Sequence, residues 1–78
     1  MPTGFTPHYQ RVIDAIIDDI AIGWLRPGDR LPSTAQLAEA YRFSPGTIRR
    51  AVDILLDRGV LRGHQGLGVF VADNPRGA

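Results

Sequence analysis

The sequence predicts a mainly α-helical domain in which three short helices are followed by a small β-hairpin. Apolar residues recur at the spacing of helices up to position 59 and then give way to short β-favouring runs. Residues typical of helix caps stand where each helix is expected to begin and end. With 78 residues and no cysteine, the chain has room for one small domain stabilised by packing rather than by disulfides.

The first helix is expected to begin at Thr6-Pro7, with threonine as the N-cap and proline at the first helical position. Gly23 is expected to end it in a left-handed conformation. Residues 24–29 contain a Pro-Gly turn, and residues 30–32 are expected to be extended because a residue before proline avoids helical dihedrals. The expected buried face consists of Ile13, Ile16, Ile17 and Ile20, and the acidic residues expected to face water are Asp14, Asp18 and Asp19.

Two more helices follow in close succession. Ser33 is the expected N-cap of the second helix and forms a capping box with Gln36, and Ser44-Pro45 begins the third helix, which Gly59 ends. The segment between the two helices is too short to cross a domain, which predicts a helix-turn-helix. The apolar faces are expected to comprise Leu37, Ala38 and Tyr41 in the second helix, and Ile48, Ala51, Val52 and Leu55 in the third.

A hairpin is predicted after the third helix. Residues 60–62 and 69–71 are the expected strands, and the glycine-rich residues 63–68 form a flexible tip between them. A hairpin in this position is a wing, so the predicted architecture is a winged helix-turn-helix of three helices plus a two-stranded wing. The expected domain spans residues 1–72, and residues 73–78 are a tail or the start of a linker.

Charge is unevenly distributed although the net charge is only +1. Residues 1–41 carry three arginines against five acidic residues, whereas residues 42–62 carry five arginines against two. Every basic residue in the chain is arginine, whose planar guanidinium suits phosphates and guanine edges. A codon bias explains the arginine usage equally well, so the hypothesis of nucleic-acid binding depends on where the charge lies.

An ordered set of short motifs runs through residues 7–72. It comprises Tyr9, Ile20 to Gly23, Pro27 to Ser33, Leu37-Ala38, Ser44, Thr47 to Arg49, Ala51, Leu55, Gly59 and Gln65 to Val71. The set resembles the N-terminal domain of GntR-family transcription regulators of bacteria. The resemblance implies sequence-specific binding to double-stranded DNA, as a repressor that binds a palindromic operator as a homodimer. It places the recognition helix, residues 44–58, in the major groove and the wing tip, residues 63–68, at the minor groove.

The residues expected to contact DNA lie at three places in the chain. If Ile48 marks the buried centre of the third helix, Gly46 and Arg50 point away from the core, and Thr47 and Arg49 flank that face. Each has an alternative role, because Ser44 is also a helix cap, Arg49 can pair with Asp53, and His64 and Gln65 can be solvated turn residues. The complete expected set is Ser33, Ser44, Gly46, Thr47, Arg49, Arg50, His64, Gln65 and Gly66.

Four residues at three places in the chain depart from the family pattern. Thr34 and Ala35 stand where the family commonly has an acidic residue and then arginine, and Pro45 stands where it commonly has arginine. Leu67 occupies a wing position that is often basic in the family. Three DNA contacts are therefore expected to be missing, and affinity and operator preference are expected to differ from the family norm.

Other classes of function find less support. His8 and His64 lie in unrelated elements with no cysteine or acidic cluster beside them, so neither a metal, a cofactor nor an enzyme is expected. The absence of a signal peptide and of a long apolar run predicts a cytoplasmic protein that does not bind a membrane. An effector ligand is not expected within this chain, because the family usually carries its ligand-binding domain after the wing.

The alternative hypothesis is a winged helix that serves protein interaction or dimerisation and has no DNA affinity. Its contact patch would be an exposed Trp24 or the faces around Phe5 and Tyr9. Packing of Trp24 and its loop over the first helix is the structural explanation that we weigh against it.

Overall fold

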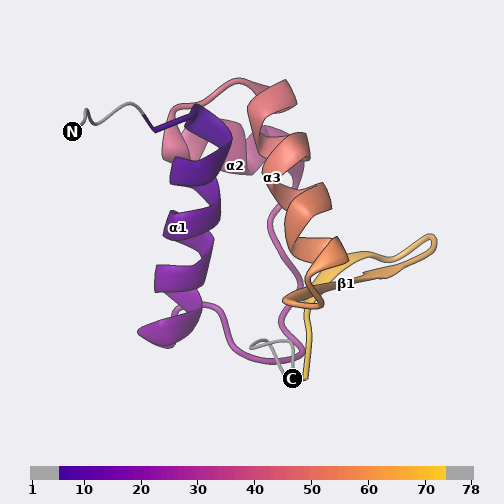
Figure 1. The fold of residues 1–78 in the computed structure, drawn as a ribbon. Coiled ribbons are helices and arrows are strands. Elements are labelled where there is room, and N and C mark those ends of the chain that lie inside the picture. Colours follow the sequence, from indigo (N-terminus) through magenta and orange to yellow (C-terminus); the bar gives the residue numbers. More distant parts are fainter. Residues whose placement is uncertain (1–5, 74–78) are drawn as a thin grey trace.

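Three helices and one hairpin form where the residue pattern predicts them. The computed structural model describes residues 6–73, which adopt the mainly α, winged helix-turn-helix architecture (Figure 1). The elements are α1 (His8–Ala21), α2 (Thr34–Tyr41), α3 (Pro45–Asp57), β1 (Leu61–His64) and β2 (Gly68–Val71).

The third helix is the centre of the arrangement, because α1, α2 and β1 all contact it. Figure 1 shows α1 and α3 beside each other, with α2 across one end of the pair. The hairpin starts at the C-terminal end of α3 and projects away from the helices. The two features expected to meet DNA therefore lie on the same side of the molecule.

The caps of α2 and α3 confirm the prediction from sequence. Ser33 Oγ accepts a hydrogen bond from the Gln36 N–H at 3.1 Å, and Gln36 Oε1 accepts one from the Ser33 N–H at 2.9 Å. Ser44 caps α3, and Pro45 is its first residue. These side chains supply partners to N–H groups that the first turn of a helix leaves unpaired, so both helices begin at defined residues.

The start of α1 differs from the prediction, whereas its end agrees with it. Pro7 rather than Thr6 is the N-cap, with an extended ψ of 147°, and no side chain among residues 6–73 caps this helix. The carbonyl of Pro7 instead accepts hydrogen bonds from the N–H groups of Gln10 and Arg11. Gly23 has a φ of +88°, the left-handed conformation predicted for the residue that follows the helix.

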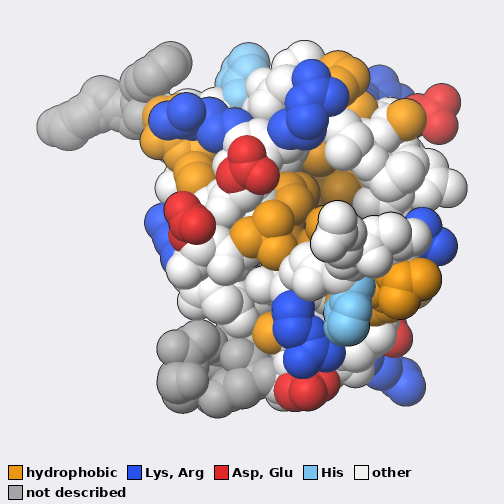
Figure 2. Space-filling model, turned by 90° about the vertical axis from the view of Figure 1, so that its right-hand side faces the viewer, with side chains coloured by type: hydrophobic (Ala, Val, Ile, Leu, Met, Phe, Trp, Pro, Cys, Tyr) orange, Lys and Arg blue, Asp and Glu red, His pale blue; other side chains and the backbone are white. Residues whose placement is uncertain are grey.

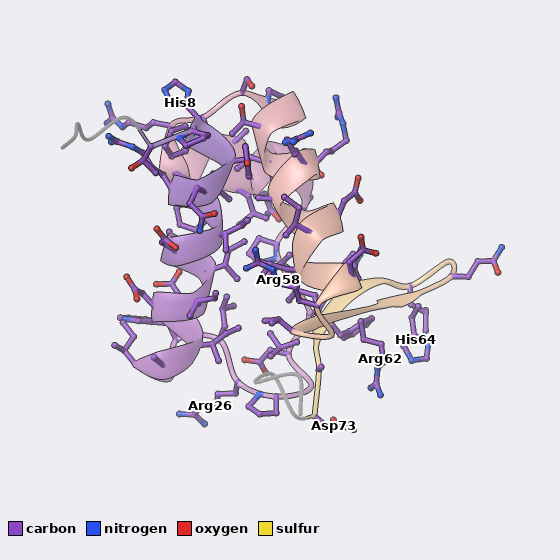
Figure 3. The ribbon with its side chains drawn as sticks, in the orientation of Figure 1. His8, Arg26, Arg58, Arg62, His64 and Asp73 are labelled. Carbon is purple, nitrogen blue, oxygen red and sulfur yellow. The ribbon has the colours of Figure 1, made fainter. Side chains whose placement is uncertain are left out.

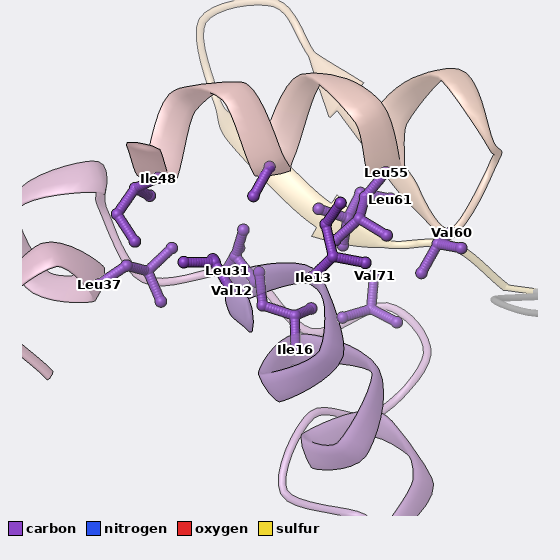
Figure 4. Close-up of a cluster of buried hydrophobic side chains, with 11 residues drawn as sticks. Val12, Ile13, Ile16, Leu31, Leu37, Ile48, Leu55, Val60, Leu61 and Val71 are labelled. Atoms are coloured by element: carbon purple, nitrogen blue, oxygen red, sulfur yellow. The ribbon is translucent and has the colours of Figure 1, made fainter. Parts of the chain in front are cut away.

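The core is apolar and draws on every element (Figure 4). Val12 in α1 is fully buried, whereas Ile17, which was expected in the buried face, is 40% exposed. Ile13 and Ile16 are buried as predicted, so the buried face of α1 is turned from Ile17 toward Val12. The buried side chains are Val12, Ile13, Ile16, Leu31, Leu37, Ile48, Ala51, Leu55, Val60, Leu61 and Val71.

Asp19 does not face water as predicted. Its carboxylate accepts a hydrogen bond of 2.7 Å from the Tyr41 hydroxyl, so it joins α1 to the end of α2. Partial burial, together with the hydrogen bond to Asp19 and its negative charge, raises the pKa of Tyr41 above its ordinary value of 10.0. Asp14 and Asp18 are exposed, as expected.

The wing is longer and better supported than the sequence suggests. Antiparallel pairing from Leu61–Val71 to His64–Gly68 leaves only residues 65–67 as the turn, so the predicted flexible tip of residues 63–68 is wrong at both ends. The predicted extended segment before α2 pairs with β2 through an isolated bridge between Arg30 and Phe70. The backbone hydrogen bonds of this pairing run from Leu31 N–H to the Val69 carbonyl (2.7 Å), from Val71 N–H to Asp29 (2.8 Å) and from Gly28 N–H to Val71 (2.8 Å).

Two large apolar side chains at the end of α1 and in the loop after it lie in solvent, whereas Leu25 packs against the core. Trp24 is 77% exposed, and Ile22 beside it is also exposed. Packing of Trp24 over the first helix is therefore not what the structure shows. Phe5, the other apolar candidate for a contact patch, lies outside the described residues, as does most of the expected tail. Within residues 6–73, no helix combines the length and the apolar character needed to span a bilayer.

Candidate nucleic-acid interface

Five of the expected DNA-contacting residues lie together at the start of α3. Ser44 Oγ accepts a hydrogen bond from the Thr47 N–H at 3.2 Å and lies 2.9 Å from Thr47 Oγ1. These two hydroxyl groups thus satisfy each other and fix the first turn. Gly46 is exposed, and no neighbouring atom lies within 4 Å of the position that a Cβ would take there. Arg49 and Arg50 follow in the next turn, and both are exposed.

The first helix contributes to this surface, which the sequence did not predict. A shallow hollow lies between the starts of α1 and α3, and Tyr9 and Arg50 both line it. The Arg50 guanidinium lies over the Tyr9 ring, 4.5 Å from its centroid, as a cation–π contact. The ring of His8 lies 5.3 Å from that of Phe43 in the turn between α2 and α3. Tyr9, the aromatic residue before the isoleucines of the first helix, was the signal in the sequence that could have predicted this contribution, since a large ring at a helix start is expected to pack on a neighbouring element.

Arg49 is oriented by no ion pair with its own helix. Asp53, one turn further on, was its alternative partner, yet among residues 6–73 no carboxylate oxygen lies within 4.0 Å of Arg49. The guanidinium is therefore available to an external anion. Its position in the second turn of α3 places it near the end of the helix where free N–H groups also attract negative charge.

The wing residues form a second group, apart from the first. His64, at the end of β1, packs edge-on against Phe70 with ring centroids 5.7 Å apart, so this side chain already has a contact within the wing (Figure 3). Gln65 and Gly66 are exposed in the turn, and the Leu67 N–H donates to the His64 carbonyl at 2.9 Å. Leu67 itself is 60% exposed. The outermost part of the wing thus carries neutral side chains.

The arginines of residues 42–62 do not form one continuous patch. Figure 3 places Arg58 on the side of α3 that faces α1, away from the wing. Arg62 lies 3.7 Å from Asp73, and both side chains are largely exposed, so this ion pair is weak. Figure 2 views the side from which the wing projects, and basic side chains lie around its edges with acidic ones among them. Fewer arginines therefore lie together on one surface than the count of arginines in residues 42–62 suggests.

Ser33 lies apart from both groups, at the start of α2, where its hydroxyl is engaged in the capping box. The expected residues thus occupy three places: the start of α2, the start of α3 and the turn of the wing. An exposed helix start with a projecting hairpin at its other end is an arrangement suited to two neighbouring grooves of a duplex, because the major groove admits one α-helix.

Comparison with known proteins gives a consistent result. The profile of the family described as "Bacterial regulatory proteins, gntR family" matches residues 8–71. The histidine utilization repressor of Klebsiella aerogenes is 46% identical over 71 residues, covering 91% of this chain and 29% of the relative. The mannosyl-D-glycerate transport/metabolism system repressor MngR of Escherichia coli is 36% identical, covering 90% of this chain and again 29% of the relative. The chain therefore spans less than a third of the length of these two proteins.

Two solved structures share the fold. A transcriptional regulator from Oenococcus oeni superimposes with a TM-score of 0.86 at 29% identity, covering 96% of this chain and 62% of the other. AraR(DBD) in complex with operator ORR3 superimposes with a TM-score of 0.80 at 33% identity, covering 92% of this chain and 88% of the other. The likeness to AraR(DBD) includes both the helices and the wing, because it covers nearly the whole of each chain.

Proposed function

Because the chain belongs to the GntR family of bacterial regulatory proteins, we propose that it binds double-stranded operator DNA sequence-specifically as the DNA-binding domain of a transcription regulator. The observation that carries the proposal is the start of α3, where Arg49 is exposed and without an ion-pair partner among the described residues, beside an exposed Gly46. The named relatives are repressors, which favours repression as the outcome of binding.

In the proposed complex, the start of α3 enters the major groove. Arg49 and Arg50 donate to guanine edges or phosphates, and Thr47 offers its methyl group to base edges, since its hydroxyl is hydrogen-bonded to Ser44. Gly46 has no side chain, so the helix backbone can approach the duplex closely at this point. Ser44 serves mainly as the cap, because its hydroxyl is already engaged with Thr47.

The wing then meets the adjacent minor groove, with Gln65 and Gly66 in its turn as the contacts. A narrow turn with a glycine is suited to the minor groove, which is about half as wide as the major groove. His64 has a smaller role in this proposal than Gln65, because its ring packs on Phe70. Ser33 has an indirect role in this proposal, because its hydroxyl caps α2 and so fixes the start of that helix beside the duplex.

Assembly and location complete the proposal. One helix and one wing bind a duplex weakly, so a homodimer on a palindromic operator is the expected functional form. The domain is proposed to comprise residues 1–72, with residues 73–78 as a tail or the start of a linker, and to act in the cytoplasm, where the DNA is. Since Ala35, Pro45 and Leu67 stand where this family commonly has basic residues, the operator preference is expected to differ from the family norm.

The decisive test is a fluorescence-anisotropy titration at several salt concentrations. The probe is a duplex that this chain has selected from a random-sequence pool, and unselected duplex is the competitor. The proposal expects affinity to fall linearly with salt in a log–log plot, and the selected duplex to compete better than random DNA. No binding at low salt by the chain at micromolar concentration would contradict it and favour a protein-interaction winged helix, for which the exposed Ile22 and Trp24 offer a surface.

A further inference from the structure

A groove separates the recognition helix from the wing, and no residue expected to bind DNA, apart from Ser33, lines it. Its volume is about 610 Å³, and it is lined mainly by the extended segment of residues 30–33 and the first half of α2, with Val52 of α3 and the start of β2 completing it. The lining is partly apolar, with leucine and valine side chains, and partly polar, with an arginine and the side chains at the start of α2. The lining residues that matter below are Arg30, Ser33, Thr34, Val52, Gly68 and Val69.

Arg30 is held against the wing within this groove. A Cβ atom on Gly68 would lie 3.1 Å from Arg30 Nε and 3.7 Å from its Cζ, so the guanidinium rests on the bare backbone of that glycine. Gly68 also has a φ of +119°, which other residues adopt only with strain. Glycine at position 68 therefore serves both the turn of the wing and the placement of the arginine.

The backbone of Arg30 is equally well fixed. Its neighbour Leu31 donates an N–H to the Val69 carbonyl, and Arg30 itself pairs with Phe70 in the bridge to β2. Within residues 6–73, no carboxylate oxygen lies within 4.0 Å of the guanidinium. Arg30 is thus an exposed cation that is oriented in advance and has no anionic partner in the described part of the chain.

We infer that this groove seats one sugar–phosphate backbone of the duplex and that Arg30 donates to a phosphate there, an inference that rests on the proposed function. If α3 lies in the major groove and the wing in the adjacent minor groove, the strand that divides the two grooves must cross the surface between them. That surface is the groove. Its apolar residues Val52 and Val69 suit sugar rings, while Arg30 and the start of α2 at Thr34 suit phosphate.

Arg30 enters the groove beside the start of α2, supported by the wing rather than by the helix. A phosphate contact carries no sequence information by itself, so Arg30 fixes the position of the domain on the duplex and does not read bases.

The test compares Arg30→Gln with Arg26→Gln, a matched loss of charge at an exposed position that does not line the groove. Titrations use the duplex selected by wild-type chain and an unselected duplex. Arg30→Gln is expected to weaken binding to both duplexes by the same factor, about three- to tenfold, and to reduce the salt slope by about one. Arg26→Gln is expected to change neither. Arg30→Lys keeps the charge and is expected to keep the slope.

Neutral methylphosphonates substituted one at a time in the selected duplex locate the contact. One such substitution is expected to weaken the binding of wild type and to leave the affinity of Arg30→Gln unchanged. The phosphate concerned should lie between the bases that α3 protects and the minor groove that the wing protects. An unaltered salt slope in Arg30→Gln, or equal sensitivity of wild type and Arg30→Gln to every substituted phosphate, would overturn the inference while leaving the proposed function intact. If wild type binds no duplex at all, the proposed function itself fails.

Discussion

The guanidinium of Arg50 lies over the ring of Tyr9, 4.5 Å from the ring centroid, so the first helix restrains a side chain at the start of the third, where we propose that DNA binds. An arginine on a helix surface ordinarily samples many rotamers, and fixing it on binding costs conformational entropy. Contact with Tyr9 removes part of this cost before DNA arrives. Arg50 and Arg49 are neighbours in sequence, yet only Arg50 is supported in this way by another element.

Tyr9→Leu is therefore expected to weaken binding to the selected duplex by about 0.5–1 kcal/mol, the usual worth of an exposed cation–π contact. Tyr9→Phe keeps the aromatic face and is expected to bind like wild type. Anisotropy titration of both variants at one salt concentration gives the comparison. Equal affinities for Tyr9→Leu and Tyr9→Phe would mean that the contact does not orient Arg50 for DNA.

Arg49→Ala is expected to weaken binding by about 1–3 kcal/mol, the size of a bidentate arginine–base contact. The loss should be larger on the selected duplex than on random DNA, because a base contact carries specificity. Arg26→Ala serves as the control for lost charge. A loss that is the same on both duplexes would assign Arg49 to a phosphate instead of a base.

Leu67→Arg is expected to tighten binding and to steepen the salt dependence by about one counterion, because the turn of the wing gains the basic group common in the family. Leu67 is 60% exposed, so the new side chain displaces no core contact. Thermal unfolding of the variant without DNA should match that of wild type. An unchanged affinity and slope would show that the turn does not approach the duplex.

The bond between Tyr41 and Asp19 predicts how stability depends on pH. Burial and the Asp19 carboxylate raise the pKa of Tyr41 above 10.0 in the folded chain, so the unfolded chain releases this proton first as pH rises. The contribution of Tyr41 to the free energy of unfolding is fully present below about pH 10 and declines as the pH rises further. Tyr41→Phe has no such proton, so denaturant titrations at pH 8 and pH 11 should show a smaller decline for it than for wild type. Equal declines would refute the linkage.

The helix boundaries were predictable from sequence because local chemistry decides them. Ser33 with Gln36 and Ser44 with Pro45 satisfy N–H groups within one turn, and no distant residue takes part. The start of α1 lacked such a side-chain cap, and there the predicted N-cap Thr6 was wrong by one residue. The fold class followed from these caps and from the change of apolar spacing after position 59.

Long-range contacts were not predictable in the same way. The pairing of Asp29 to Leu31 with β2 joins segments about 40 positions apart, and no local pattern announces a partner at that distance. The hydrogen bond of Asp19, which the sequence placed in water, depends equally on how α1 and α2 are both packed on α3. For the candidate site, sequence gave the residues at the start of α3, while their support by Tyr9 required the structure.

The hydrogen bonds from residues 28–31 to Val69 and Val71 prevent the wing from swinging independently of the helices. These bonds hold the base of the wing, and they therefore constrain the separation between the start of α3 and the turn of the wing. On DNA, a constrained separation between the two contacts favours duplexes whose major and minor grooves have the matching spacing. Duplexes whose twist or minor-groove width gives another spacing must deform to bind, and the energetic cost of this deformation depends on their sequence. Base pairs that touch no side chain are thus expected to affect affinity through the shape that they give the double helix.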